Sequence, residues 1–104
     1  MEMALTNLLD NALKFTPAGG SVTIGAEPAD DRLRLWVQDT GVGVAPSDQP
    51  HIFERFFRGR GGADAPGSGL GLAIVQGIAQ AHGGTVSVES QPSQGSRFTI
   101  DLPL

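Results

Sequence analysis

Asn7-Leu-Leu-Asp-Asn11-Ala-Leu-Lys14 is the segment from which the fold of this chain is best inferred. If residues 2–15 form a helix with about 100° between successive residues, Asn7, Asn11 and Lys14 lie within one narrow arc. The opposite side of the same helix carries the apolar residues Leu5, Leu8, Leu9, Ala12 and Leu13. One helix face is therefore predicted to pack in a core, and the other to present polar groups.

The polar face of this helix has the residue types that a metal and a phosphate need. A carboxamide oxygen is a hard, neutral ligand, and Mg²⁺ usually takes one or two protein ligands beside its waters and phosphates. Asn11 fits that role, and Lys14, about one turn further on, offers a point charge for phosphate oxygens. Taken alone, Asn7 and Asn11 would equally fit a solvated helix face, so this segment leaves both interpretations open.

Asp39-Thr-Gly41-Val-Gly43 follows a predicted strand. Residues 32–38 alternate between polar and apolar types, which is typical of a half-buried strand, so Asp39 lies where the strand ends and a glycine-rich turn begins. A carboxylate there can accept a hydrogen bond from an exocyclic amine such as that of adenine, and the two glycines let backbone approach a flat ring. An ordinary turn that starts at an aspartate is the alternative.

Gly67-Ser-Gly69-Leu70-Gly71 opens a second helical pattern, over residues 69–82. A helix start without bulky side chains offers unpaired N–H groups and a positive dipole end to phosphates. No strand precedes these glycines, which argues against a Rossmann fingerprint; residues 58–68 instead predict a loop, or lid, that folds over a ligand. Two apolar stripes predict that most of the helix is buried: Leu70, Ile74, Ile78 and Ala81, and Leu72, Val75 and Ala79.

Together with Phe53-Glu-Arg-Phe-Phe-Arg58, these segments occur in one characteristic order. The chain resembles the catalytic, ATP-binding domain of bacterial sensor histidine kinases, in the superfamily that also holds gyrase-type, heat-shock-chaperone and mismatch-repair ATPases. The four segments are similar to that family's N, G1, F and G2 boxes, and His82-Gly-Gly84 and residues 95–103 are similar to its closing hairpin. The resemblance covers nearly the whole chain.

The resemblance implies a role for each matching residue. Asn11 would ligate Mg²⁺, Asn7 and Lys14 would face the phosphates, and Asp39 would pair with the adenine amino group. Ser96 would reach adenine through water. The complete set implied for ATP is Asn7, Asn11, Lys14, Phe15, Asp39, Gly41, Gly43, Arg58, Gly67, Gly69, Leu70, Gly71 and Ser96. Within it, Asn11 is the metal ligand, and Asn11, Lys14 and Arg58 are the catalytic residues, with Arg58 at the terminal phosphate.

Asn7 occupies the position at which the related ATPases carry a glutamate that activates water. An asparagine cannot act as a general base, so we expect poor hydrolysis and a domain that holds ATP for transfer. The implied acceptor is a histidine on a separate dimerisation domain, which would in turn serve a response regulator. That domain normally lies N-terminal to this region, and the usual first strand and helix of the ATP-binding domain are expected to be mostly missing here. An ATP-binding regulatory module without kinase activity is the alternative.

Two histidines and three phenylalanines complete the set of candidates. His82 matches a structural position before a turn, and His51 has no partner that the sequence reveals, so we expect a surface or packing role. Phe53, Phe56 and Phe57 are predicted to pack at the base of the lid.

Length and composition predict one domain, residues 1–104, with one core. Eleven acidic residues against seven basic ones give a net charge of −4, which argues against nucleic-acid or anionic-membrane binding. Arg55, Arg58 and Arg60 nevertheless cluster at the predicted lid. The chain has no cysteine, membrane span or signal peptide, which fits a cytoplasmic location or the cytoplasmic part of an inner-membrane sensor kinase.

The layout predicts an α+β fold. After the helix over residues 2–15, Val22, Ile24 and Ala26 alternate in a strand, a turn spans residues 28–31, and Leu33, Leu35 and Val37 alternate in the next strand. After the helix over 69–82, two further strands contain Val86 and Val88, and Phe98, Ile100 and Leu102. We expect a two-layer, Bergerat-type sandwich: helices on one face of a mixed, mostly antiparallel sheet, with the nucleotide between helices and lid.

Overall fold

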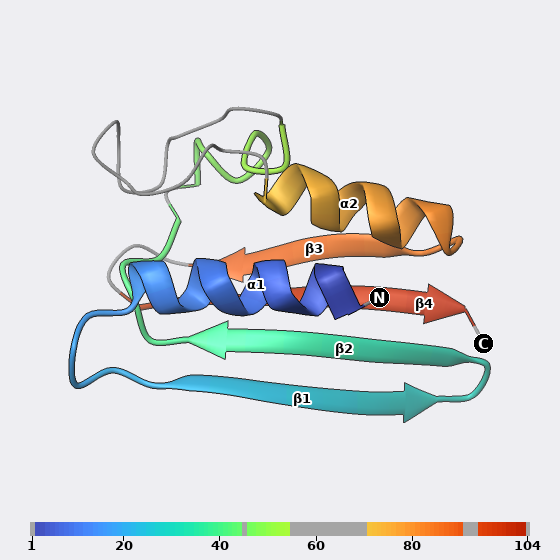
Figure 1. Ribbon diagram of the computed structural model, residues 1–104, viewed down its shortest axis with the longest axis horizontal. Coiled ribbons are helices and arrows are strands. Elements are labelled where there is room, and N and C mark those ends of the chain that lie inside the picture. The colour runs from blue at the N-terminus through green and yellow to red at the C-terminus, as the bar shows by residue number, and fades with distance from the viewer. Residues whose placement is uncertain (1, 45, 55–70, 91–93, 104) are drawn as a thin grey trace.

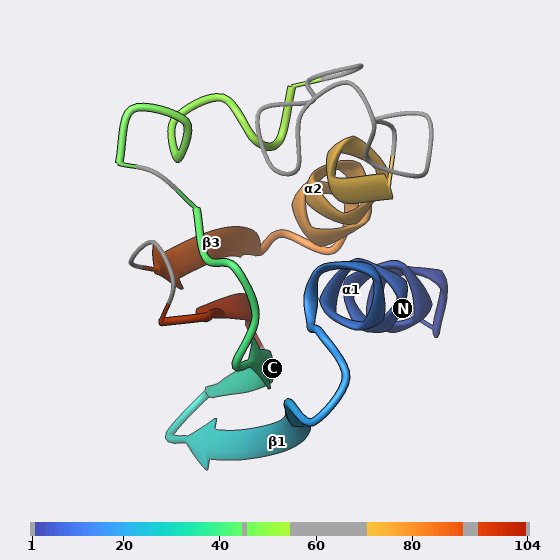
Figure 2. The ribbon, with the colours of Figure 1, turned by 90° about the vertical axis from the view of Figure 1, so that its left-hand side faces the viewer.

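The computed structural model describes all residues except 1, 45, 55–70, 91–93 and 104. Within this part of the chain, two helices cover one face of a four-stranded sheet, and the other face is open (Figures 1 and 2). The predicted two-layer α+β fold is confirmed. Its elements are α1 (Glu2–Phe15), β1 (Val22–Ala29), β2 (Arg32–Asp39), α2 (Gly71–Ala81), β3 (Thr85–Ser90) and β4 (Ser96–Pro103).

The strand order is β1-β2-β4-β3, and every neighbouring pair of the described strands is antiparallel. The register sets Val37 of β2 opposite Ile24 of β1 and Phe98 of β4, and Phe98 opposite Val88 of β3. Because opposite residues point to the same face, this row lies under the helices. The buried apolar residues are Ala4, Leu8, Ala12, Val37, Val44, Ile52, Val75, Ala79, Phe98 and Ile100.

The turn between β1 and β2 is tighter than predicted. Pro28 and Ala29 continue β1, Pro28 lies opposite Leu33, and only Asp30 and Asp31 form the loop. Asp30 has a φ of 49°, which a two-residue hairpin requires and which aspartate tolerates better than most residues. Proline is accommodated because β1 is the edge of the described sheet, where one side of the strand needs no ladder hydrogen bond.

The predicted apolar faces are only partly buried. Leu13 was expected in the core but is 64% exposed, because it lies about 140° around the helix axis from the buried Leu8. Ile24 of the edge strand is 54% exposed, although its position points under the helices. Helix α2 buries Val75 and Ala79, whereas Ile74 and Ala81 of its other stripe are exposed, so its burial was overestimated.

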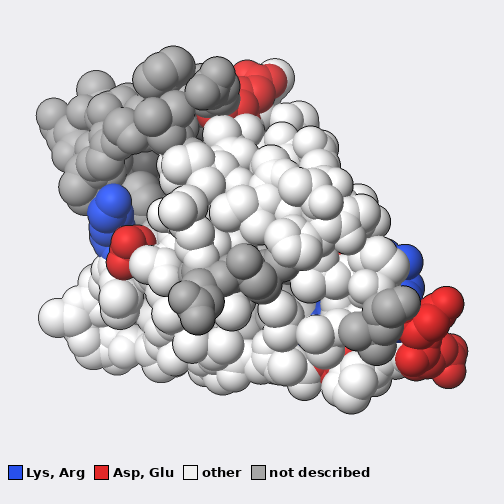
Figure 3. Space-filling view, turned by 45° about the vertical axis from the view of Figure 1, so that its right-hand side comes forward, with Lys and Arg blue, Asp and Glu red and all other residues white. Residues whose placement is uncertain are grey.

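On the face shown in Figure 3, charged groups lie mostly at the margins, and uncharged residues cover the middle of the described surface. On the open face of the sheet, Asp101 of β4 forms salt bridges with Arg32 and Arg34 of β2. The hydrogen bond from Arg32 is the main reason why the pKa of the Asp101 carboxyl lies below its ordinary value.

Neither described helix has the length and apolar character needed to cross a membrane.

Candidate functional site

Three elements bring the predicted site residues to one end of the molecule. Figure 1 shows that α1 ends, β2 ends and α2 begins at the same end of the sheet, because the two helices run antiparallel. The described members of the predicted set are Asn7, Asn11, Lys14, Phe15, Asp39, Gly41, Gly43, Gly71 and Ser96. Arg58, Gly67, Gly69 and Leu70, with the predicted lid over residues 58–68, lie outside the described residues.

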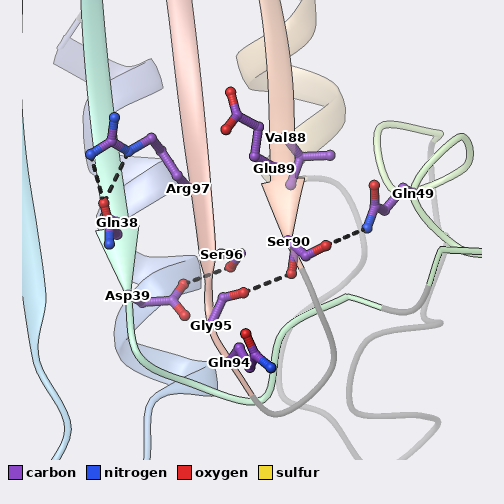
Figure 4. Close-up of a pocket in the computed structure, with 10 residues that line it drawn as sticks. All are labelled: Gln38, Asp39, Gln49, Val88, Glu89, Ser90, Gln94, Gly95, Ser96 and Arg97. Atoms are coloured by element: carbon purple, nitrogen blue, oxygen red, sulfur yellow. Dashed lines mark hydrogen bonds between the residues drawn. The ribbon is translucent and has the colours of Figure 1, made fainter.

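Asp39 is a buried carboxylate with a fixed orientation. It is the last residue of β2, as predicted, and is only 2% exposed. The Gly41 amide donates to its Oδ1 at 2.9 Å. The Ser96 hydroxyl donates to its Oδ2 at 3.0 Å (Figure 4). A carboxylate accepts up to about four hydrogen bonds, so it can hold both partners and accept another from a ligand. Ser96, predicted to reach a ligand through water, contacts Asp39 directly.

Gly41 joins the end of α1 to the segment after β2. A Cβ atom at this position would lie 2.1 Å from the carbonyl oxygen of Phe15, so the close approach requires glycine. The next amide, that of Val42, donates to the same Phe15 oxygen at 3.1 Å. The glycine was predicted to let backbone approach a flat ring; in the structure, the group that approaches it is the last turn of α1. Phe15 therefore contributes to the site through its backbone.

The polar face of α1 has the predicted arrangement, with Asn7 and Asn11 half-buried and Lys14 exposed. The side-chain nitrogen of Asn11 is buried and has no hydrogen-bond partner among the described residues. A buried polar atom without a partner is costly, which marks this amide as a place where a ligand would be stabilising. A half-turn of the side chain exchanges its nitrogen and oxygen, so Asn11 can present either atom.

Magnesium fits this donor set only together with a phosphate ligand. The described residues contain no group of three or more His, Cys, Asp or Glu side chains that could hold a metal ion. Mg²⁺ commonly binds through one or two protein oxygens and completes its shell with phosphates and water. The Asn11 carboxamide is suited to that single-ligand role, so the ion would arrive with its nucleotide.

The start of α2 offers backbone groups instead of side chains. Gly71 is its first residue and is half-buried, and a Cβ atom there would meet nothing within 4 Å. The first N–H groups of an α-helix have no partner within the helix and lie at the positive end of its dipole. Gly71 therefore leaves both space and donors at this position.

A cavity of about 670 Å³ lies at the ends of β2, β3 and β4 (Figure 4). Asp39 and Ser96 contribute to its wall, but Asn7, Asn11 and Lys14 do not, so the cavity adjoins Asp39 without including the polar face of α1. The lining residues are Gln38, Asp39, Gln49, Val88, Glu89, Ser90, Gln94, Gly95, Ser96 and Arg97.

Residues 1–104 match the family described as histidine kinase-, DNA gyrase B- and HSP90-like ATPases. The chain belongs to this ATPase family. The sensor-like histidine kinase SenX3 of Mycobacterium tuberculosis is 48% identical over 103 residues, which are 96% of this chain and 25% of that protein. The ATPase domain described here thus spans about a quarter of the length of that relative.

Solved structures agree with this assignment. The mycobacterial sensor histidine kinase MprB superposes with a TM-score of 0.87 at 40% identity, over 97% of this chain and 70% of that one. Full-length ShkA, whose structure contains AMPPNP, superposes with a TM-score of 0.85 at 42% identity, over 97% of this chain and 20% of that one. The ATPase domain therefore shares its fold with histidine kinase structures, one of which contains an ATP analogue.

The remaining candidates of the ATPase domain have packing or surface contacts. His82 Nδ1 lies 2.9 Å from the carbonyl oxygen of Ile78 and closes the end of α2. His51 is exposed and, contrary to expectation, has a partner three residues away, Glu54 at 2.9 Å. Phe53 packs edge to face against Phe98, with ring centroids 6.2 Å apart. Phe56 and Phe57, like Arg55 and Arg60, lie outside the described residues.

Three residues beside Asp39 were not predicted from the sequence as part of the site. Gly95, with a φ of 87°, packs so tightly that a Cβ atom would lie 2.1 Å from the Asp39 carbonyl oxygen. Ser90 and Gln49 form hydrogen bonds that connect this glycine to the segment after Gly43. A glycine before a strand was a usable signal for Gly95. The role of a serine at a strand end depends on the sheet register, which the sequence does not reveal.

Proposed function

We propose that this ATPase domain binds Mg-ATP and donates the γ-phosphate to a histidine on a separate dimerisation domain. The observation that carries the proposal is Asp39, a buried carboxylate fixed by Gly41 and Ser96 at the end of the sheet to which α1 brings its asparagines. A fixed acceptor beside a small-residue turn suits an exocyclic amine, such as that of adenine. The match to the ATPase family over the whole chain supports the nucleotide class.

Each described residue has a separate part in this proposal. Asp39 accepts a hydrogen bond from the adenine amine, and Asn7 and Lys14 face the phosphates. Asn11 holds Mg²⁺ through its carboxamide oxygen. When bound, the ion neutralises charge that builds up between the β- and γ-phosphates during phosphoryl transfer. Amides at the start of α2, and Arg58 of the predicted lid, would contact the triphosphate from the other side.

The acceptor domain would belong to the longer protein that the relatives suggest, and the downstream partner would be a separate protein. A dimerisation domain with a phosphoacceptor histidine, and a response regulator acting after it, are the partners we propose. Asn7 supports transfer over hydrolysis, because a carboxamide cannot take a proton from water. Water in the site would therefore lack the general base that a hydrolytic ATPase needs.

A titration of the 104-residue chain tests nucleotide binding. We expect heat on addition of ATP with Mg²⁺, with an affinity in the micromolar to millimolar range, or about −4 to −8 kcal/mol. We expect none with Mg²⁺ alone, because a single carboxamide does not make a metal site. Absence of heat with Mg-ATP, in a sample whose circular dichroism confirms folding, would contradict the proposal.

A second experiment separates transfer from a purely regulatory role. The chain is mixed with a histidine-bearing acceptor domain from a related kinase and with ATP labelled at the γ-phosphate. We expect label on the acceptor and little free phosphate. In the variant Asn7→Glu, a carboxylate stands where hydrolytic relatives carry their base, so free phosphate should increase by up to about 10²-fold. Binding of ATP without any label on several acceptor domains would favour the regulatory role.

A further inference from the structure

The hydroxyl of Ser90 connects two segments of the site. Ser90 is the last residue of β3, and the register sets it opposite Ser96, the residue that donates to Asp39. Its Oγ accepts a hydrogen bond from the Val44 amide at 2.7 Å and donates one to the Gly95 carbonyl oxygen at 2.8 Å. One side chain thus joins the segment after Gly43 to the start of β4. Figure 4 shows its contact with Gly95.

Gln49 forms a second connection, between the segment after Gly43 and the end of β3. Its Nε2 donates to the Val44 carbonyl oxygen at 3.1 Å and to the Ser90 carbonyl oxygen at 3.0 Å. Val44 is 1% exposed, and Ser90 and Gln49 are half-buried, so these hydrogen bonds are partly shielded from water. We call Val44, Gln49, Ser90 and Gly95 the Ser90 junction.

The Ser90 junction is connected to Asp39 by two routes. Through Gly95, it fixes the backbone that packs on the Asp39 carbonyl group and carries the Ser96 hydroxyl to Asp39 Oδ2. Through Val44, it fixes the chain three residues beyond Gly41, whose amide donates to Asp39 Oδ1. The donors of these two hydrogen bonds, Gly41 and Ser96, therefore lie close in the chain to Val44 and Gly95, which Ser90 contacts.

We propose that Ser90, supported by Gln49, is a positioning residue for adenine recognition, which it controls by fixing the Asp39 carboxylate through Gly41 and Ser96. This inference rests on the proposed function, since it assumes that Asp39 receives the adenine amine. Ser90 itself would touch no part of the nucleotide. Its removal should therefore weaken the contact made by Asp39 and leave the phosphate contacts of α1 unchanged.

A purely structural role for Ser90 would give a different energetic pattern. Loss of stability or a loosened core would weaken nucleotide binding by the same factor, whichever residue occupies position 39. If Ser90 acts through Asp39, substitutions at the two positions have non-additive effects on affinity. Once the Asp39 carboxylate is gone, the substitution at Ser90 can no longer weaken its contact with adenine. A double-mutant cycle between Ser90 and Asp39 distinguishes the two roles.

The experiment measures Mg-ATP dissociation constants of the 104-residue chain by NMR titration, which also covers millimolar affinities. We expect Ser90→Ala to raise the constant by about 3- to 10-fold, the effect of one lost hydrogen bond. In the Asp39→Asn background, the same substitution should raise it by less than about 2-fold. Ser90→Thr keeps a hydroxyl and should recover most of the affinity.

The matched control is Ser87→Ala, on the same strand, because Ser87 is exposed and its register partner Thr99 lies on the open face. Gln49→Ala is the second variant if Ser90→Ala does not fold, and it should give the same pattern with a smaller factor. Equal factors in both Asp39 backgrounds, or unchanged affinity in Ser90→Ala, would overturn the role of Ser90 while leaving ATP binding intact. If the unsubstituted chain binds no ATP, the proposed function fails and the inference fails with it.

Discussion

The two halves of the candidate site differ in how completely the protein finishes them. Asp39 is buried, and Gly41 and Ser96 hold both of its oxygens, with Gly95 packed against its backbone. The polar face of α1 is more open: Lys14 is exposed, and the buried amide nitrogen of Asn11 has no partner among the described residues. One half is already organised by protein contacts, and under the proposed function the ligand would complete the other.

This difference has a physical origin in the elements that carry each half. Under the proposed function, the Asp39 carboxylate has to be oriented, because one hydrogen bond would decide between bases. A sheet with buried neighbours supplies that rigidity. The α1 groups proposed for phosphates and Mg²⁺ would have to remain available, because such partners bring strong charges and their own water. We expect substitutions in the two halves to affect different measurements.

The largest expected effect concerns Asn11, in the more open half of the candidate site. Asn11→Ala removes the proposed metal ligand, and we expect phosphoryl transfer to a supplied histidine domain to fall by on the order of 10³-fold, or about 4 kcal/mol. Nucleotide affinity should fall much less, because the contact at Asp39 remains. Transfer rate and ATP affinity are measured on the same sample. Equal losses in both would show that Asn11 supports binding in general instead of the transferring phosphate.

The second effect concerns stability and belongs to the organised half. Gly95→Ala would place a Cβ atom against the Asp39 carbonyl oxygen at a positive φ, so we expect a loss of about 2–3 kcal/mol in the free energy of unfolding. Gly77→Ala is the control, since a Cβ atom there meets nothing within 4 Å and a helix interior gains about 0.5–1 kcal/mol. Urea denaturation compares the two. A Gly95→Ala variant as stable as the control would contradict the close packing.

The third effect concerns the selectivity of Asp39 between adenine and guanine nucleotides. Asp39→Asn replaces an acceptor by a group that turns a donor toward the amine, so ATP affinity should fall by about 1–3 kcal/mol. GTP carries a carbonyl oxygen at the corresponding position and should bind the unsubstituted chain poorly. The ratio of the two dissociation constants, before and after substitution, is the measurement. A chain that never distinguishes ATP from GTP would refute the assignment of Asp39.

The smallest effect lies on the opposite face of the sheet. Arg32 and Arg34 lower the pKa of Asp101, so this carboxylate stabilises the fold above its ordinary value of 3.8 and stops doing so as the pH falls through the lowered one. Asp101→Asn should lower the melting temperature slightly at pH 7 and not at all in strong acid. Asp10→Asn, on the exposed side of α1, controls for net charge. A difference that persists in acid would exclude the ion pair as its cause.

The sequence predicted the parts of this molecule that depend on local pattern. The polar arc of α1 follows from helical periodicity, and the position of Asp39 at a strand end follows from alternation. The Asp39–Ser96 contact does not, because it requires β2 and β4 to pair in one register across a long stretch of chain. The exposure of Leu13 and Ile24 depends on what packs beside them, which no local pattern encodes.

Trp36 gives the molecule a built-in optical probe. It is the single tryptophan in a chain without tyrosine, and its ring lies across Gly25, where a Cβ atom would come within 2.0 Å of it. The guanidinium of Arg97 stands 4.3 Å above the ring, on the face of the sheet that the helices leave open. Unfolding removes both neighbours and should shift the emission, whereas a nucleotide bound between the helices and the predicted lid, away from the open face, should leave it nearly unchanged. Ligand binding and integrity of the sheet can therefore be followed independently in one cuvette.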